Sequence, residues 1–237
     1  MGYFIGTDVG GIFTDLWVAE RGGRARVFKT LTTLDVMSGV MNAVQLAADY
    51  FDRDFDEFCS ELERFGHGTT VGLNALLTGN AASTLVLTTA GFGDTLEIGR
   101  LRRQTAGLSE MEVGDWMLHE RHAPLVPRER IIEIDERIDV TGKILLVLND
   151  SSARGVLRVW AASDLEAVAI CTLRATMNPA HELRLAEFMR GVLPDVFITL
   201  SHQISLVVGE CARMATAAAN AMLLGNPHSA LIGMQHG

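Results

Sequence analysis

The chain has 237 residues, 48% of them hydrophobic and 21% charged, a composition typical of a globular protein with a sizeable core. Its formal net charge of -9 argues against a general binder of nucleic acid or of anionic membranes, because such partners require clustered Lys and Arg. No apolar run approaches the roughly 20 residues of a transmembrane helix. No signal-type segment follows Met1, so we expect a protein of the cytoplasm.

The first 50 residues predict three antiparallel strands followed by a helix. Residues 3–9 and 12–20 are mainly apolar runs on either side of a double glycine, and residues 25–29 continue the meander after a second Gly-Gly turn. Asp35 precedes a helical apolar pattern that predicts a helix to about residue 50. This opening is a hairpin meander covered by one amphipathic helix.

The rest of the chain alternates between predicted helices and strands. This alternation is interrupted by an acidic amphipathic stretch, a short strand and a long irregular segment. We expect the irregular segment to be functional or an interface. The order of elements predicts a mixed α/β sheet flanked by helices, as in the ribonuclease H-like fold. The predicted ranges are 52–63 (acidic stretch), the strand before Gly66, 70–77 (helix ended by Gly79), 83–89 (buried strand), 101–130 (irregular), 131–138 (half-buried strand), 156–162 (helix), 166–173 (central strand), 179–189 (helix), 195–202 (strand) and 210–224 (helix).

The three cysteines, Cys59, Cys171 and Cys211, are odd in number and widely separated. Their apolar or helical surroundings predict buried free thiols, and no Cys/His cluster indicates a zinc site.

The first hairpin turn carries the strongest chemical signal. Gly10 and Gly11 can take backbone angles closed to other residues, and successive amides in such a turn can bind an anion. Thr14 offers a hydroxyl donor, and Asp8 and Asp15 can hold Mg²⁺ through water. The alternative is a plain turn, but an aspartate inside an apolar strand favours a functional role because its burial would be costly.

Five segments, taken in order, resemble the hydantoinase A/5-oxoprolinase proteins, which share the actin-like ATPase fold. The segments are GTDVGGIFTD (6–15), HGTTVGLNALL (67–77), LTTAGFGDTLEIGR (87–100), NPAHE (178–182) and LSHQISLVVGECAR (200–213). Residues 102–139 look particularly like the acetophenone carboxylase branch. The resemblance implies the first lobe of an actin-like ATPase, with a family N-terminal domain over residues 1–200 and the start of the next domain over 201–237.

The resemblance also implies site residues and partners. ATP and Mg²⁺ (or Mn²⁺) are the implied cofactors, with a hydantoinase B-like partner subunit and a small carbonyl substrate. Asp8, Asp15 and His67 are the implied catalytic residues, and the two aspartates are the implied metal ligands. Nucleotide contacts are implied for Gly10, Gly11, Phe13, Thr14, Thr69, Thr70, Asn74 and Arg100.

Several polar residues have open interpretations. Arg100, with Arg102 and Arg103, either pairs with acidic neighbours or meets a carboxylate or phosphate. His119 and His122 are expected at a surface or interface, and His181 is expected to cap or pack.

The function that these residues predict is an ATP-dependent subunit of a hydrolase or carboxylase (ligase). Such a subunit phosphorylates a carbonyl, enolate or bicarbonate for ring opening or carboxylation. Ile12, Gln203 and Ala212 stand where the family usually has Thr, Glu and Glu, and these departures favour an alternative, a non-catalytic assembly or regulatory subunit. A third possibility, an actin-like sugar kinase, is disfavoured by the segments that begin at His67, Asn178 and Leu200.

Overall fold

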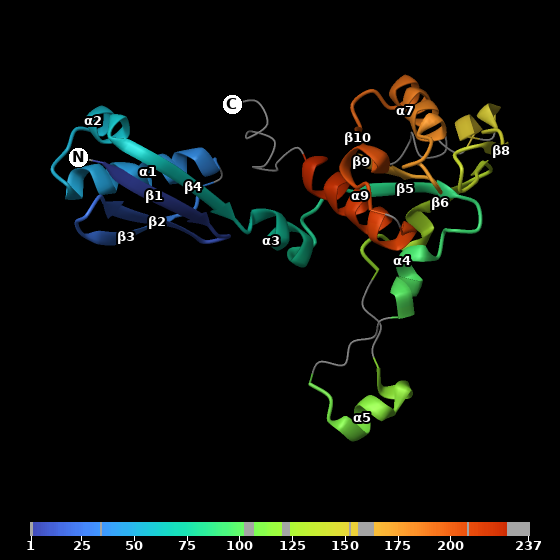
Figure 1. The fold of residues 1–237 in the computed structure, drawn as a ribbon, viewed down its shortest axis with the longest axis horizontal. Helices are drawn as coiled ribbons and strands as arrows, with labels where there is room; N and C mark the ends of the chain where they lie inside the picture. Colours follow the sequence, from blue (N-terminus) through green and yellow to red (C-terminus); the bar gives the residue numbers. More distant parts are fainter. Residues whose placement is uncertain are drawn as a thin grey trace. The chain divides into compact units, whose positions relative to one another are not determined.

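The computed structural model describes residues 2–33, 35–101, 107–119, 124–151, 153–155, 164–207 and 209–226. These residues form two compact units, an N-terminal unit over residues 2–80 and a C-terminal unit over residues 81–226. Figure 1 shows the elements of each unit.

The N-terminal unit is a four-stranded sheet in the order β3-β2-β1-β4, in which the first three strands are antiparallel and β4 runs parallel to β1. Its elements are β1 (Tyr3–Val9), β2 (Phe13–Glu20), β3 (Ala25–Leu31), α1 (Val36–Tyr50), α2 (Phe55–Ser60), β4 (Leu62–Thr69) and α3 (Val71–Thr78).

One face of this sheet packs on α1 and α2, and the alternation along the strands decides which side chains face the helices. Ile5, Val9 and Leu16 are buried with the apolar stripe of α1. The Tyr3 ring packs against that of Phe58 in a tilted arrangement, with ring centroids 4.7 Å apart. Burying each such side chain contributes about 1.5–3 kcal/mol, so this core holds the strands that carry the first motif.

The C-terminal unit is built on a parallel sheet in the order β10-β9-β5-β6. Its strands are β5 (Thr84–Thr89), β6 (Ile131–Ile134), β9 (Ala167–Cys171) and β10 (Phe197–Leu200), with a separate ribbon of β7 (Arg137–Ile138) and β8 (Ile144–Leu146). Its helices are α4 (Thr95–Ile98), α5 (Glu110–Gly114), α7 (Ala180–Val192), α8 (Ser201–Ile204) and α9 (Glu210–Leu224).

Helices α7 and α9 cover opposite faces of this sheet (Figure 1). Leu87 and Ile170 pack with Leu185 of α7, whereas Val86 and Cys171 pack with the Ala-rich face of α9. Successive residues of both central strands are therefore buried, as expected for a parallel sheet covered on both sides.

The mixed α/β class expected from the sequence is confirmed, with the described strands divided between two four-stranded sheets and the β7–β8 ribbon. The single strand expected over residues 131–138 is wrong, because β6 ends at Ile134 and β7 begins at Arg137. Pro179 precedes α7 as its N-cap rather than occupying the first helical position. The helix expected over residues 156–162 lies outside the described residues.

No helix in the described part of the chain is long and apolar enough to cross a membrane.

Candidate functional site

The turn between β1 and β2 presents two backbone amides to its surroundings. The Gly10 amide donates to the Phe13 carbonyl at 2.9 Å. Thr32, the residue after β3, holds the turn by donating to the carbonyls of Gly10 and Ile12, each at 2.9 Å. Within the described residues, the amides of Gly11 and Ile12 donate no hydrogen bond, and both residues are exposed. These two N–H groups are available to an anion.

Gly10 and Gly11 suit the turn because neighbouring atoms lie close to it, and not because the backbone takes unusual angles there. Neither Gly10 nor Gly11 has a positive φ, which corrects the expectation from the sequence. A Cβ on Gly10 would lie 3.2 Å from the Phe13 carbonyl oxygen, and one on Gly11 would lie 3.1 Å from Nδ2 of Asn74. The side-chain amide of Asn74, on α3, therefore reaches the turn.

Two carboxylates lie beside the turn on the open face of the sheet. Asp8 and Asp15 are directly opposite each other across β1 and β2, a register that places their Cβ atoms about 5 Å apart. Asp8 is exposed, so the expectation of a buried aspartate is wrong. Lys29 of β3 approaches Asp15 at 3.0 Å. The two carboxylates with one lysine suit a water-coordinated Mg²⁺ beside phosphate oxygens.

A strip without side chains continues from Asp8 along the same face. The register of β1 with β4 places Gly6 beside Gly66 and Asp8 beside Gly68. A Cβ on Gly6 would meet nothing within 4 Å. A ligand can therefore approach the main chain closely at this strip, which fits a nucleotide phosphate chain better than a closed hairpin would.

Phe13 and Thr14 point to opposite faces of β2. Phe13 is 44% exposed and lies on the carboxylate face, with Lys29 Nζ 4.9 Å from its ring centroid. Thr14 is fully buried, with Oγ1 3.1 Å from Oγ1 of Thr32. The Thr14 hydroxyl thus lies away from the carboxylates and holds the turn to the end of β3.

The structure does not place His67 with the carboxylates. It is the register partner of Thr7, and its Nδ1 lies 2.6 Å from the Thr7 hydroxyl on the face opposite Asp8. Its Nε2 is buried and has no hydrogen-bond partner in the described residues. This nitrogen can serve a ligand or water on the other side of the sheet.

Thr69 and Thr70 join the end of β1 to the start of α3. The Thr69 hydroxyl donates to the Val9 carbonyl at 3.3 Å and accepts from the Val71 amide at 3.2 Å. The Thr70 amide also donates to the Val9 carbonyl, at 3.1 Å. Both threonines thereby fix the position of α3, and with it Asn74.

The remaining sequence candidates belong to the C-terminal unit. Arg100 is exposed and has a left-handed backbone with φ of 59°. His119 is half-buried, with Nε2 3.0 Å from the Val113 carbonyl oxygen. Arg102, Arg103 and His122 lie outside the described residues.

A buried polar network at the carboxyl edge of the second sheet is the feature that sequence reasoning missed. The Glu182 carboxylate, fully buried, accepts bonds from the Thr172 amide (3.0 Å), the Ser201 hydroxyl (2.6 Å) and the His202 amide (3.2 Å), and pairs with His202 Nδ1 at 2.6 Å. Because charged residues usually lie at the surface, sequence patterns do not predict a buried glutamate such as Glu182. The polar run around residues 178–182 is the one indication of this network in the sequence.

His181 was expected to cap or pack, and it is a buried partner of a carboxylate. Its Nδ1 lies 2.5 Å from Glu136 Oε2, and Glu136 also bonds the Thr89 hydroxyl. Arg213 is buried and donates to the Thr172 carbonyl at 2.7 Å. In the described residues His181 Nε2, Thr172 Oγ1 and Arg213 Nε have no partner, so the network has capacity for further hydrogen bonds, for example to internal water.

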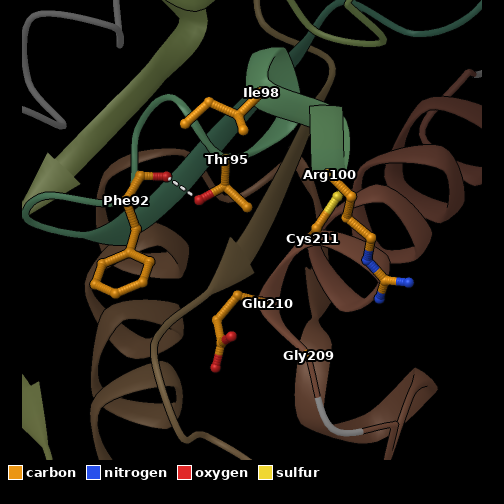
Figure 2. Close-up of a pocket in the computed structure, with 7 residues that line it drawn as sticks. All are labelled: Phe92, Thr95, Ile98, Arg100, Gly209, Glu210 and Cys211. Atoms are coloured by element: carbon orange, nitrogen blue, oxygen red, sulfur yellow. Dashed lines mark hydrogen bonds between the residues drawn. The ribbon is translucent and has the colours of Figure 1, made fainter. Parts of the chain in front are cut away.

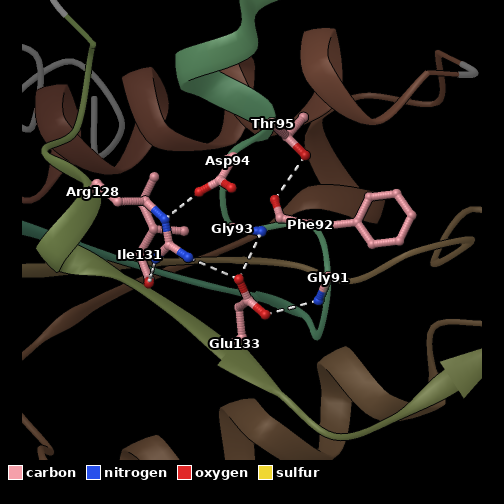
Figure 3. Close-up of polar contacts among 8 residues, drawn as sticks. All are labelled: Gly91, Phe92, Gly93, Asp94, Thr95, Arg128, Ile131 and Glu133. Atoms are coloured by element: carbon pink, nitrogen blue, oxygen red, sulfur yellow. Dashed lines mark hydrogen bonds and ion pairs between the residues drawn. The ribbon is translucent and has the colours of Figure 1, made fainter.

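The loop after β5 is held by a second polar cluster (Figure 3). Glu133 accepts from the amides of Gly91 and Gly93 at 2.8 and 3.2 Å. Arg128 bridges Glu133 at 2.8 Å and Asp94 at 2.5 Å. The contacts with Asp94 and Glu133 raise the pKa of Arg128 above its ordinary value. The Glu133 carboxylate thus binds both glycine amides of the loop of residues 91–93 and stabilises its conformation.

No group of three or more His, Cys, Asp or Glu side chains that could hold a metal occurs in the part of the chain that the structure describes.

The sequence matches the hydantoinase/oxoprolinase N-terminal region over residues 4–193. It is 32% identical over 225 residues to the acetophenone carboxylase gamma subunit of Aromatoleum aromaticum, covering 92% of this chain and 31% of that subunit.

Two solved structures share the fold. The ATP-dependent caprolactamase from Pseudomonas jessenii is 30% identical with a TM-score of 0.76, covering 98% of this chain and 32% of that one. Nucleotide-free acetone carboxylase is 21% identical with a TM-score of 0.83, covering 97% of this chain and 34% of that one; it supports the fold alone. The chain spans about a third of the length of the relatives it matches.

Proposed function

Because the chain belongs to the family of the hydantoinase/oxoprolinase N-terminal region, we propose that it is part of an ATP-dependent hydrolase or carboxylase subunit and binds ATP phosphates at the β1–β2 turn. The observation that carries the proposal is the convergence at this turn of the free amides of Gly11 and Ile12 with the facing carboxylates of Asp8 and Asp15. Anion donors and metal-ligand carboxylates meet there on an open face.

The residues divide into those that contact the nucleotide and those that position them. Gly11, Ile12 and Asn74 supply N–H donors for phosphate oxygens, and Asp8 and Asp15 orient the water shell of Mg²⁺ or Mn²⁺. The positioning residues, which hold the turn and the start of α3, are Gly10, Thr14, Thr32, Thr69 and Thr70.

When bound, ATP supplies a phosphoryl group for activating a carbonyl, enolate or bicarbonate oxygen. Lys29 and the turn amides stabilise negative charge that shifts among the phosphate oxygens. The names of the relatives, an acetophenone carboxylase gamma subunit and a caprolactamase subunit alpha, support assembly with further subunits. A small carbonyl substrate and a hydantoinase B-like partner are part of the same proposal. Arg100, which was expected at the nucleotide, belongs to the C-terminal unit, and its role stays a prediction. His67 contacts a ligand from the opposite face of the sheet.

A non-catalytic assembly subunit is the second candidate, and the exposed apolar face of the first sheet favours it. Trp17, Val27 and Leu31 are 46%, 61% and 67% exposed on the same face as Asp15, and Ile12 at the turn is 69% exposed. In that role the chain keeps the fold and offers this face to another protein.

Titration calorimetry of the full chain with ATP and Mg²⁺ separates the two functions. We expect binding by the wild type and a loss of affinity of about tenfold or more for Asp8→Asn, since removing a group that orients a metal's ligands typically has that effect. Omitting Mg²⁺ should lower the affinity of the wild type for ATP and leave the affinity of Asp8→Asn for ATP little changed.

The matched control is Asp49→Asn, which alters an exposed aspartate of α1 whose side chain, among the described residues, accepts from Gln45 alone. It should bind like the wild type. Equal affinities of wild type and Asp8→Asn would remove the turn from the nucleotide site. Absence of binding by the wild type, with stable capture of a longer subunit, would favour the assembly function.

A further inference from the structure

A cavity of about 340 Å³ opens in the C-terminal unit between the loop after β5 and the start of α9 (Figure 2). Its volume lies at the lower end of the range for small-molecule sites. Its lining includes Phe92, Thr95, Ile98, Arg100, Glu210 and Cys211.

Glu210 gives this cavity an unpaired carboxylate. The residue is half-buried, and among the described residues its carboxylate makes no ion pair and accepts no hydrogen bond. It stands at the first position of α9, where the helix dipole favours a negative charge. The dipole explains why a carboxylate is stable there, but it supplies no counter-ion. The carboxylate is therefore available to a cation that enters the cavity.

Arg100 lines the same cavity and does not neutralise Glu210. Gly99 and Arg100 both have a left-handed backbone, with φ of 54° and 59°. In Figure 2 the exposed Arg100 guanidinium points away from the Glu210 carboxylate. Its Nη2 lies 3.4 Å from the position that a Cβ on Gly209 would take. The cation of this side chain is thus directed out of the cavity.

Phe92 and Ile98 form the apolar wall of the cavity. The Phe92 ring lies on the same side of the view in Figure 2 as the Glu210 carboxylate. The guanidinium carbon of Arg137 lies 5.4 Å from the centroid of this ring. Because the chain's own cation already contacts the ring, we assign the ring to the apolar part of a ligand. Ile98 is 55% exposed, so a ligand would cover apolar surface that water now contacts.

The loop that carries this wall is held in place by its own hydrogen bonds. The Thr95 hydroxyl donates to the Phe92 carbonyl at 2.7 Å, and its oxygen can still accept a bond. The cluster of Glu133, Arg128 and Asp94 holds the residues just before it (Figure 3). A prearranged loop lowers the entropy that binding must overcome.

We propose that this cavity binds a small primary amine with an aromatic or aliphatic body, its ammonium on Glu210 and its body against Phe92 and Ile98. An ammonium group donates up to three hydrogen bonds, and the Glu210 carboxylate and the Thr95 hydroxyl oxygen are acceptors in the lining. The same carboxylate repels an anion. The proposal goes beyond the nucleotide site, because every residue in it belongs to the C-terminal unit.

Cys211 provides the measurement, because it lines the cavity and is only half-buried. Cys59, in the N-terminal unit, is the internal reference. The rate of alkylation of each cysteine of the full chain by iodoacetamide is followed by peptide mass spectrometry. The probes are phenethylamine, its neutral analogue phenethyl alcohol, the anion phenylacetate, and Nα-acetyl-lysine amide as a mimic of a lysine on another protein.

Phenethylamine at about ten times its dissociation constant should slow alkylation of Cys211 about tenfold by mass action, with no effect on Cys59. Phenethyl alcohol should need about tenfold higher concentration, the typical value of one charged hydrogen bond. Phenylacetate should protect least, and the lysine mimic should protect less than phenethylamine because it brings no ring to Phe92. Equal protection by the amine and the alcohol, stronger protection by phenylacetate or the lysine mimic, or no protection by any probe overturns the proposal.

Two variants locate the ammonium, with affinity read from the probe concentration that halves the alkylation rate. Glu210→Gln should lower the affinity for phenethylamine about tenfold and leave that for phenethyl alcohol unchanged, which also shows that the cavity persists. Glu110→Gln alters an exposed glutamate at the first position of α5 and should keep the preference for the amine. A preference that survives in Glu210→Gln, or a loss of protection by the alcohol as well, overturns the assignment.

Discussion

Thr32 shows how single residues outside the motif build the candidate site. Its amide and hydroxyl donate to the carbonyls of Ile12 and Gly10, whereas the amides of Gly11 and Ile12 donate to no described residue. Thr14 completes this arrangement from inside the sheet. The carbonyls of Gly10 and Ile12 are thereby engaged, which leaves the amides of Gly11 and Ile12 available to an anion.

We expect Thr32→Val to destabilise the chain by about 1–2 kcal/mol, because the Gly10 carbonyl and the Thr14 hydroxyl each lose a partner in a partly buried place. Urea unfolding followed by circular dichroism measures this change. Thr216→Val removes the hydroxyl of an exposed residue, which in the described part of the chain bonds the Ala212 carbonyl alone, and should change stability by less than about 0.5 kcal/mol. Equal effects of the two substitutions would contradict the role given to Thr32.

At the scale of elements, α1 and α3 determine what the first hairpin can do. Helix α1 covers one face of the sheet, so Asp8 and Asp15 remain on the other. Helix α3 begins where β4 ends and brings Asn74 to Gly11. The motif residues acquire their geometry from these two helices and not from the hairpin alone.

The N-cap of α1 predicts a pH dependence of stability. The Ser38 hydroxyl and the amides of Met37 and Ser38 lower the pKa of Asp35 below its ordinary value. A lowered folded-state pKa means that the cap stabilises the helix above the unfolded pKa and that this contribution is lost as pH falls through the folded pKa.

The midpoint of urea unfolding should therefore be lower for Asp35→Ala than for the wild type at pH 7, and the difference should shrink at pH 3. Asp56→Ala, in the first turn of α2, is a control because its side chain is no N-cap. A difference that stays constant with pH would contradict the assignment of Asp35 as an ionised cap.

At the scale of the whole molecule, the sequence predicted the elements and the family well. Apolar periodicity located the strands and helices because most of them bury one defined face, as with α1, or both faces, as with β5 and β9. The division into two sheets was not predicted, since pairing between distant strands leaves no local signal. The domain boundary expected near residue 200 stays a prediction.

The candidate site was predicted in part. The sequence identified Asp8, Asp15 and the turn, and strand alternation alone could have warned that Thr14 faces away from Asp15. The face of His67 depends on the register of β4 with β1, which the sequence does not show. The buried Glu182 and Arg213 were missed, because charged residues are buried only when tertiary partners satisfy them.

The most direct test of the central claim is a nitrogen–proton NMR titration of the labelled chain with pyrophosphate and Mg²⁺. We predict that the amide signals of Gly11 and Ile12 shift the most, followed by the side-chain amide of Asn74, and that Asp8→Asn reduces these shifts. Signals of Gly11 and Ile12 that stay in place while the chain binds pyrophosphate elsewhere would contradict the account.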